Sequence, residues 1–192
     1  MEERQPLGDA TQTRILDAAD DLLERRGVRG VTIAELARRS ELSRPTIYRN
    51  WADADDVVRS TLLRRVERIL SALPARVHTR AALVDDVLLF TALFRRDPLF
   101  ARLLADEPEA FTRYTLERVG SSQRLILQWL TTAIGTAQAQ DSVRPAPPSE
   151  IAVMLLLVTQ SAVLSHGTVS ELISEDAWER ELRAALDGLL RP

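Results

Sequence analysis

Residues 32–51 read TIAELARRSELSRPTIYRNW, and this stretch decides the fold that we expect. Thr32, followed three residues later by Glu35, has the spacing of a capping box at the start of a helix. The apolar pattern then breaks for three residues. Ser43 is a suitable N-cap for a second short helix, with Pro45 in its first turn, where a missing N–H costs nothing. Two short helices joined by a tight turn are typical of a helix-turn-helix.

The second of these helices presents mostly polar side chains once its apolar residues are set aside. Leu42 and Ile47 are expected to anchor the turn and the second short helix to the helix expected over residues 11–26. Arginine can bind guanine through two hydrogen bonds, and threonine can contact a thymine methyl group. A tyrosine hydroxyl and a helix N-terminus suit phosphate oxygens. The residues that we expect to meet DNA are Thr32, Ser43, Arg44, Pro45, Thr46, Tyr48, Arg49 and Asn50.

Charge is distributed unevenly along the 192 residues, although the net charge is only −3. Residues 25–51 contain seven arginines and two acids, whereas residues 1–24 contain two arginines and seven acids. Residues 52–192 contain 16 arginines and 19 acids. One basic segment in an acidic chain is the pattern expected when a single face meets phosphate. A solvated charged surface would give the same counts, and charge alone does not separate the two interpretations.

The rest of the chain has helical periodicity, and no stretch alternates as a strand would, so we expect an all-α protein of about nine helices. Gly27 is expected to end the first helix and Gly167 to cap the helix that precedes it in the C-terminal part. Besides the two short helices, the expected helices cover residues 11–26, 53–72, 80–95, 98–105, 108–139, 149–165 and 175–190.

The first third of the chain resembles the N-terminal domain of the tetracycline-repressor-like (TetR) family. The resemblance rests on ILDAADDLLERRG at 15–27, VTIAELARRS at 31–40 and LSRPTIYRNW at 42–51. It implies a three-helix DNA-binding domain over residues 1–52 and a helical ligand-binding and dimerisation bundle over residues 53–192. It also implies a homodimer that binds an inverted-repeat operator in double-stranded DNA, usually a repressor released by a small molecule.

Carried over by position, the resemblance gives individual residues expected roles. Thr32 would bind phosphate, and Tyr48 and Arg49 would hold phosphate or reach an adjacent base. The residues expected to face bases are Arg44, Pro45 and Thr46.

Two positions depart from the family pattern. Glu41 stands in the turn where the family usually has glycine, and a non-glycine residue with positive φ costs on the order of 1 kcal/mol. Ala54 stands where the family usually has a lysine, and Asp53, Asp55 and Asp56 surround it. Acids favour a helix N-terminus, so plain capping explains them. Their functional consequence would be a lost phosphate contact.

Residues 151–158, IAVMLLLV, are apolar on nearly every face of a helix, so this helix must bury two sides. With the helix over 175–190 it suits a four-helix bundle formed by two chains. A core within one chain is the alternative. The residues expected in the dimer interface are Met154, Val158, Trp178, Leu182, Leu186 and Leu189.

A cavity for a small apolar effector is expected among the helices between residues 80 and 166. Ordinary core packing is the alternative for each residue, and a regulator without ligand sensing, constitutive or controlled by protein partners, is the alternative function. The residues that could line the cavity are Phe90, Phe94, Leu103, Phe111, Tyr114, Trp129 and His166.

Other classes of protein are disfavoured. The chain has no cysteine and two histidines, His78 and His166, so we expect no metal and no cofactor. No catalytic motif stands out, and we expect no catalytic residue and no enzyme. The N-terminus lacks the order of a signal peptide. The longest apolar run has eight residues, short of the ~20 that span a bilayer, so a cytoplasmic protein without a membrane partner is expected.

Overall fold

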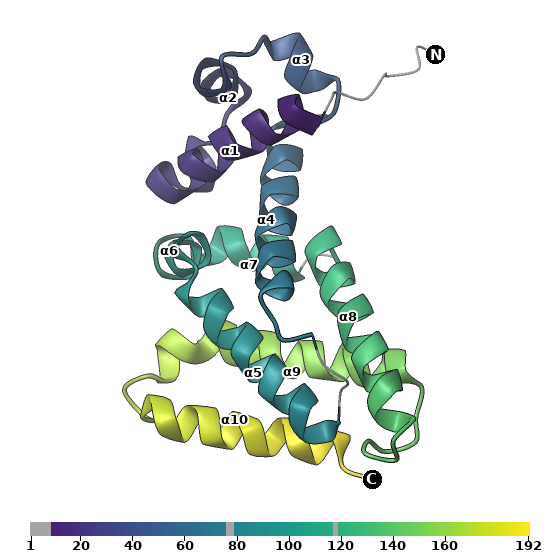
Figure 1. Ribbon diagram of the computed structural model, residues 1–192. Coiled ribbons are helices and arrows are strands. Elements are labelled where there is room, and N and C mark those ends of the chain that lie inside the picture. The colour runs from purple at the N-terminus through teal and green to yellow at the C-terminus, as the bar shows by residue number, and fades with distance from the viewer. Residues whose placement is uncertain (1–8, 76–78, 117–118) are drawn as a thin grey trace. The chain divides into compact units, whose positions relative to one another are not determined.

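The computed structural model describes residues 9–75, 79–116 and 119–192, and in these ranges the chain forms ten α-helices, one 3-10 helix and no strand (Figure 1). The predicted all-α class is therefore confirmed. The elements are α1 (Asp9–Arg26), η1 (Val28–Gly30), α2 (Ile33–Ser40), α3 (Arg44–Tyr48), α4 (Ala54–Ser71), α5 (Arg80–Arg96), α6 (Pro98–Asp106), α7 (Pro108–Leu116), α8 (Ser121–Gln138), α9 (Pro148–Val169) and α10 (Glu175–Leu190). His78 lies outside the described residues.

The chain packs into two compact units. The N-terminal unit comprises the described residues up to Arg65 together with Pro98–Ser122, and the C-terminal unit comprises Val66–Asp97 with Gln123–Pro192. The domain boundary expected between residues 52 and 53 stays a prediction.

In the N-terminal unit, α2 packs on α1 and α3 packs on α2. The buried face of α1 is the apolar face that the sequence shows, with Ile15, Ala19 and Leu23 fully inaccessible to solvent. α6 also packs on α1, and α7 packs on α6. The helices that carry the predicted helix-turn-helix therefore share a core with a segment that lies about 60 residues further along the chain.

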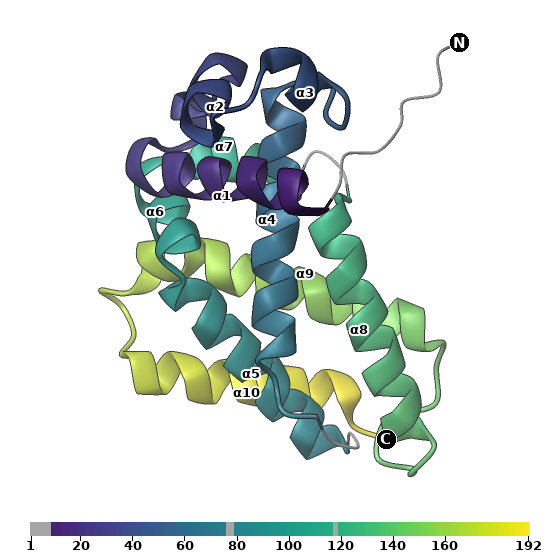
Figure 2. The ribbon, with the colours of Figure 1, turned by 45° about the horizontal axis from the view of Figure 1, so that its top comes forward.

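In the C-terminal unit, α10 runs beside α5 and α9 (Figure 2). Its apolar core includes Leu83 from α5, Ile134 from α8, Leu155 from α9 and Leu186 from α10. The periodic leucines of α10 thus pack inside their own chain, because spacings of three and four place them on one helical face.

Two predicted helix boundaries were wrong. The helix expected over residues 108–139 is two helices, α7 and α8, with Val119 and Gly120 outside both. Glycine is a poor helix former inside a helix but is accepted at the N-cap, and Gly120 occupies that position directly before α8 begins at Ser121. Gly167, expected as a cap, lies within α9, which ends at Val169. One glycine costs a helix only about 1 kcal/mol, so it need not end one.

α9 is longer than its apolar run suggested. Among the described helices it is one that is long and apolar enough to cross a membrane, judged by length and composition alone. Only 28% of its most apolar 18-residue window is buried. A helix that is apolar on most faces but buried on one leaves apolar surface for a further contact.

Candidate nucleic-acid interface

Both predicted N-caps of the helix-turn-helix are present. Thr32 Oγ1 accepts a hydrogen bond from the backbone N–H of Glu35 at 3.2 Å. Ser43 Oγ accepts one from the backbone N–H of Thr46 at 3.3 Å and lies 2.8 Å from the Thr46 hydroxyl. These caps satisfy N–H groups that a helix start otherwise leaves unpaired, so α2 and α3 begin where the local sequence directs.

The turn between α2 and α3 accommodates Glu41 in a left-handed conformation, with φ 56° and ψ 35°. A glycine would adopt this conformation without strain, whereas glutamate adopts it at a cost of about 1 kcal/mol. Arg14 from α1 donates to the carbonyl of Ser40 at 2.6 Å and lies 3.8 Å from the Glu41 carboxylate. The turn is therefore held by a cation on the helix beneath it.

α3 is anchored on one side and open on the other. Ile47 is fully buried, and the indole N–H of Trp51 donates to Ser60 Oγ of α4 at 2.8 Å. Tyr48 is 46% exposed. Of the other residues expected to meet DNA, Thr32, Ser43, Arg44, Pro45 and Arg49 are exposed, and Thr46 and Asn50 are half-buried. Most of the predicted set therefore faces solvent.

The arginines of α2 are paired with carboxylates. Arg38 bonds the Glu35 carboxylate at 2.8 Å, and Arg26 lies 3.5 Å from the same group. The hydrogen bond from Arg38 lowers the pKa of Glu35 below its usual value. Arg39 pairs with Asp21 of α1 at 2.5 Å. The charges of these arginines are thus largely balanced within the protein.

Arg44 of α3 and Arg49, which directly follows this helix, have no such partners in the described ranges. Arg44 and Arg49 are both exposed, and neither has an acidic partner among the residues that the structure describes. An arginine whose hydrogen-bond donors are unused inside the protein can offer them to a phosphate or a base edge. Arg44 and Arg49 therefore offer unpaired positive charge at the two ends of the exposed face of α3.

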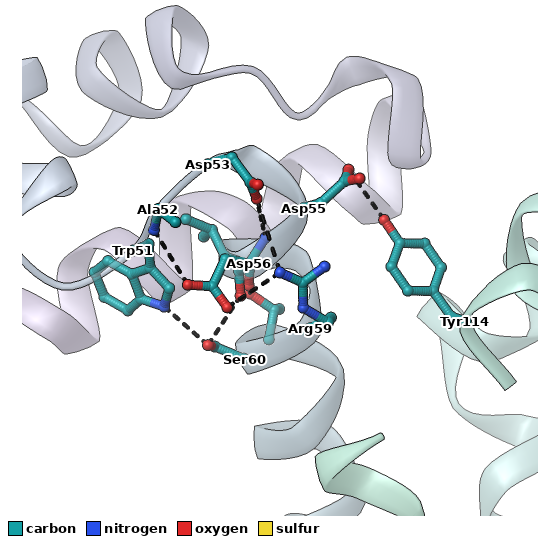
Figure 3. A network of polar contacts seen from close by, with 10 residues as sticks. Trp51, Ala52, Asp53, Asp55, Asp56, Arg59, Ser60 and Tyr114 are labelled. Carbon is teal, nitrogen blue, oxygen red and sulfur yellow. Dashed lines mark hydrogen bonds and ion pairs between the residues drawn. The ribbon is translucent and has the colours of Figure 1, made fainter. Parts of the chain in front are cut away.

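The first turn of α4, which follows Trp51, is acidic, and its carboxylates bind groups of the protein itself (Figure 3). Asp53 Oδ1 accepts from the backbone N–H of Asp56 at 2.7 Å, and Asp56 Oδ2 accepts from that of Ala52 at 3.2 Å. Arg59 lies 3.3 Å from Asp56 and 3.8 Å from Asp53. These two aspartates cap the helix, as the alternative interpretation of the sequence expected. The role of Arg59 was missed, although its spacing from Asp56 is that of an ion pair along a helix.

Tyr114 on α7 donates its hydroxyl to Asp55 Oδ1 at 3.2 Å (Figure 3). Burial, followed by the nearby Asp55 carboxylate, raises the pKa of Tyr114 to about 12. Tyr114 was expected in a ligand cavity, and the structure places it against the start of α4. No local pattern could have revealed this contact, because 59 residues separate the two side chains.

The other residues expected to line a cavity fall into separate groups. Phe90 lies 6.0 Å from Phe94 and 6.4 Å from Trp129 between ring centroids, and all three belong to the C-terminal unit. Leu103 and Phe111 are buried in the N-terminal unit, where Phe111 meets Phe100 edge-on at 6.1 Å. Three aromatic side chains of the predicted set are thus brought together.

His166 belongs to a polar cluster that joins α5, α9 and α10. Its Nε2 lies 2.8 Å from the Glu175 carboxylate and 2.7 Å from Arg95 Nη2, and its ring meets Trp178 edge-on at 4.9 Å. The hydrogen bond from Arg95, followed by that from His166, lowers the pKa of Glu175 to about 2. This cluster fastens the start of α10 to the ends of the other two helices.

The residues expected in a dimer interface also lie in different environments, some packed in the core of their own chain and one exposed. Leu182 and Leu186 are buried in the core of their own chain, and Val158, Trp178 and Leu189 are half-buried against it. Met154 is 45% exposed, on the same face of α9 as exposed Val153 and Leu157. Of the six predicted interface residues, Met154 on α9 is therefore the one that is exposed.

Comparison with known proteins identifies what the chain resembles. The model of the bacterial regulatory proteins of the tetR family matches residues 15–61. An uncharacterized HTH-type transcriptional regulator of Mycobacterium tuberculosis is 34% identical over 180 residues, which are 94% of this chain and 94% of that protein. Among solved structures, Salmonella enterica GusR matches with a TM-score of 0.62 at 22% identity, over 98% of this chain and 99% of that one. A transcriptional regulator from Saccharomonospora viridis in complex with choline matches with a TM-score of 0.54 at 21% identity, over 94% and 95%.

Proposed function

This chain belongs to the tetR family of bacterial transcription regulators, which bind DNA through a helix-turn-helix, and on that premise we propose its specific action. It binds an inverted-repeat operator as a cytoplasmic homodimer and represses transcription until a small apolar ligand releases it. The observation that carries the DNA-binding part is the exposure of Arg44, at the start of α3, and of Arg49, directly after it, which have no acidic partner in the described part of the chain.

The proposed contacts follow from the exposure of each residue. Arg44 lies in the first turn of α3 and faces base edges, where a bidentate arginine contact specifies guanine. Arg49 and Tyr48 hold phosphate on the flank. Thr32 uses its oxygen as a cap, so its hydroxyl hydrogen remains available to a phosphate oxygen.

Selection of binding sites from a random pool of double-stranded DNA, with the full-length protein, tests this proposal. The expected product is an inverted repeat, because a two-fold dimer presents two copies of α3 to grooves ~34 Å apart or a multiple of it. Enrichment of no sequence above non-specific binding would refute the proposal.

The homodimer is proposed to form through α9. Val153, Met154 and Leu157 expose 43%, 45% and 50% of their surface, and contiguous apolar surface of this kind marks an interaction site. A second copy is the occupant that an inverted-repeat operator requires.

Leu157→Glu tests the interface, because a glutamate buried without a partner is costly. We expect the variant to sediment as a monomer in analytical ultracentrifugation. Leu172→Glu is the matched control, since Leu172 is 84% exposed in the segment between α9 and α10. Leu186 is unsuitable, because it is fully buried in its own chain and a charge there would disrupt the fold. A dimer that tolerates Leu157→Glu would refute this interface.

The ligand is proposed to bind beside the aromatic group formed by Phe90, Phe94 and Trp129. Aromatic side chains suit an apolar or aromatic molecule, and the regulator from Saccharomonospora viridis provides a precedent for a small molecule bound by this fold. The ligand can release DNA only if it binds the DNA-free geometry of the protein more tightly than the DNA-bound one.

A thermal-shift screen of small aromatic and aliphatic compounds tests the ligand proposal. A ligand at 100 times its Kd adds about 2.7 kcal/mol to stability, and Trp129→Ala is expected to remove most of the shift. The same compound is expected to weaken operator binding. Compounds that stabilise the protein without changing operator affinity would favour the constitutive regulator instead.

A further inference from the structure

Glu107, the residue between α6 and α7, binds the backbone that leads into the helix-turn-helix. Glu107 Oε1 accepts a hydrogen bond from the backbone N–H of Val28, in η1, at 3.0 Å. The preceding residue, Gly27, has φ 70°, and a Cβ there would overlap the Glu107 carboxylate. Glycine at this position is therefore what admits the carboxylate to the backbone.

This contact uses only one of the two carboxylate oxygens of Glu107. Within the described part of the chain, the second carboxylate oxygen of Glu107, Oε2, is buried and has no hydrogen-bond partner. A buried polar atom without a partner costs free energy. Departures of this kind from local optimisation are expected where a residue serves function.

Two further polar contacts join the same segment to the N-terminal helices. Arg102 Nη1 of α6 donates to the carbonyl of Glu24, in the last turns of α1, at 2.7 Å. Tyr114 of α7 donates to Asp55 in the first turn of α4. Residues 24–28 precede α2 in the sequence, and Asp55 follows α3. The α6–α7 segment thus holds the chain on both sides of the helix-turn-helix.

We propose that Glu107 and Tyr114 are positioning residues for DNA binding. By fixing η1 and the start of α4, they set the orientation of α2 and α3, which lie between those points. Recognition geometry must be held within about 0.5 Å to be productive. The inference rests on the proposed operator binding, and it assigns to the α6–α7 segment a part in operator affinity that requires no contact with DNA.

The fold offers a way to remove these contacts without dismantling the N-terminal unit. α4 is held to α1 independently, by Arg64 paired with Asp17 at 2.8 Å and Arg65 paired with Asp20 at 2.7 Å. We therefore expect variants at residues 107 and 114 to leave this packing in place. They remove only the hydrogen bonds to Val28 and Asp55, at the two ends of the helix-turn-helix.

The test measures operator affinity of full-length Glu107→Ala, Glu107→Gln and Tyr114→Phe, with the operator selected by the unmodified protein. Loss of a hydrogen bond to a charged group corresponds to a change of about tenfold, so Glu107→Ala is expected to bind about tenfold more weakly. Glu107→Gln keeps an oxygen acceptor and is expected within about threefold of the unmodified protein. Tyr114→Phe is expected to weaken binding about threefold to fivefold.

The sign of the effect separates positioning from electrostatics. Removing an acid from a DNA-binding protein should strengthen binding if charge alone acted, whereas positioning predicts weaker binding. Glu109→Ala removes an equal charge from an exposed position on α7 and is expected to leave affinity unchanged or slightly raised. The Val28 amide hydrogen should exchange slowly with solvent in the unmodified protein and in Glu107→Gln. It should exchange faster in Glu107→Ala.

Affinities are compared at a temperature at which circular dichroism shows every variant folded. Unchanged affinity in both Glu107→Ala and Tyr114→Phe would overturn the inference, as would equal weakening by Glu107→Ala and Glu107→Gln. If Glu107→Ala does not fold, Tyr114→Phe decides. Failure of the unmodified protein to select any DNA would instead refute the proposed function, which distinguishes the two failures.

Discussion

α2 and α3 are both short helices with exposed arginines, yet their charges are used differently. On α2, Arg38 and Arg39 are paired with Glu35 and Asp21. On α3, Arg44 remains without an acidic partner among the described residues, as does Arg49 just after it. Counting basic residues therefore overstates the surface that is ready for phosphate. What matters is which arginines keep their hydrogen-bond donors unused.

The largest expected effect is the difference in operator affinity between two double variants. Each variant removes two arginines, one pair at α3 and the other pair on α2. Arg44→Ala with Arg49→Ala should weaken operator binding strongly, since one lost bidentate base contact costs ~1–3 kcal/mol. Arg38→Ala with Arg39→Ala should weaken it much less, because these guanidinium groups already direct donors to Glu35 and Asp21 within the protein. Fluorescence anisotropy with the selected operator measures both double variants. Equal losses would show that pairing within the protein does not govern the contribution of an arginine.

A smaller effect is expected at the start of α4, where the aspartates are satisfied internally and no lysine is present. Ala54→Lys should add one phosphate contact per chain, and affinity falls with salt at a slope of ~0.9 per phosphate neutralised. In the Ala54→Lys dimer, the plot of log affinity against log salt concentration should therefore be steeper by about 1.8 than in the unmodified dimer. Sequence preference should change little, because phosphate contacts orient the protein on DNA and do not distinguish bases. Binding titrations across a salt series measure this. An unchanged slope would mean that this turn does not approach DNA.

The smallest effect concerns the pairing on α2 itself. Arg38 lowers the pKa of Glu35 in the folded protein, so this carboxylate contributes stability that is present above its unfolded pKa. That stability is lost as pH falls through the lower folded value. A carboxyl titration by nuclear magnetic resonance should show Glu35 titrating below its usual range, and Arg38→Ala should return it toward that range. A midpoint that does not move in Arg38→Ala would contradict the pairing.

Sequence reasoning placed the helix-turn-helix because its determinants are local. The caps at Thr32 and Ser43 bond backbone groups three residues away, so residue types at fixed spacing suffice to predict them. The same reasoning failed at Gly167, because a single glycine in a long apolar helix has an effect smaller than the packing around it.

Candidate site residues in the second half of the chain were less predictable. Leu186 and Met154 both occur at apolar helical spacings, yet one is fully buried in its own chain and the other is 45% exposed. Periodicity identifies an apolar face, but it does not say whether the same chain or a partner covers that face.

The sequence by itself determined the all-α class, the position of α2 and α3, and the residues that α3 turns to solvent. Only the tertiary structure decided the long-range polar contacts. Asp21 pairs with Arg39, and Tyr114 bonds Asp55. The carboxylate of Glu107 occupies the space that a side chain at Gly27 would fill. A capping bond depends on neighbours along the chain, so the chain specifies it directly. The Glu107–Val28 contact joins residues 79 apart, and it exists because helices packed by their apolar faces bring those groups together.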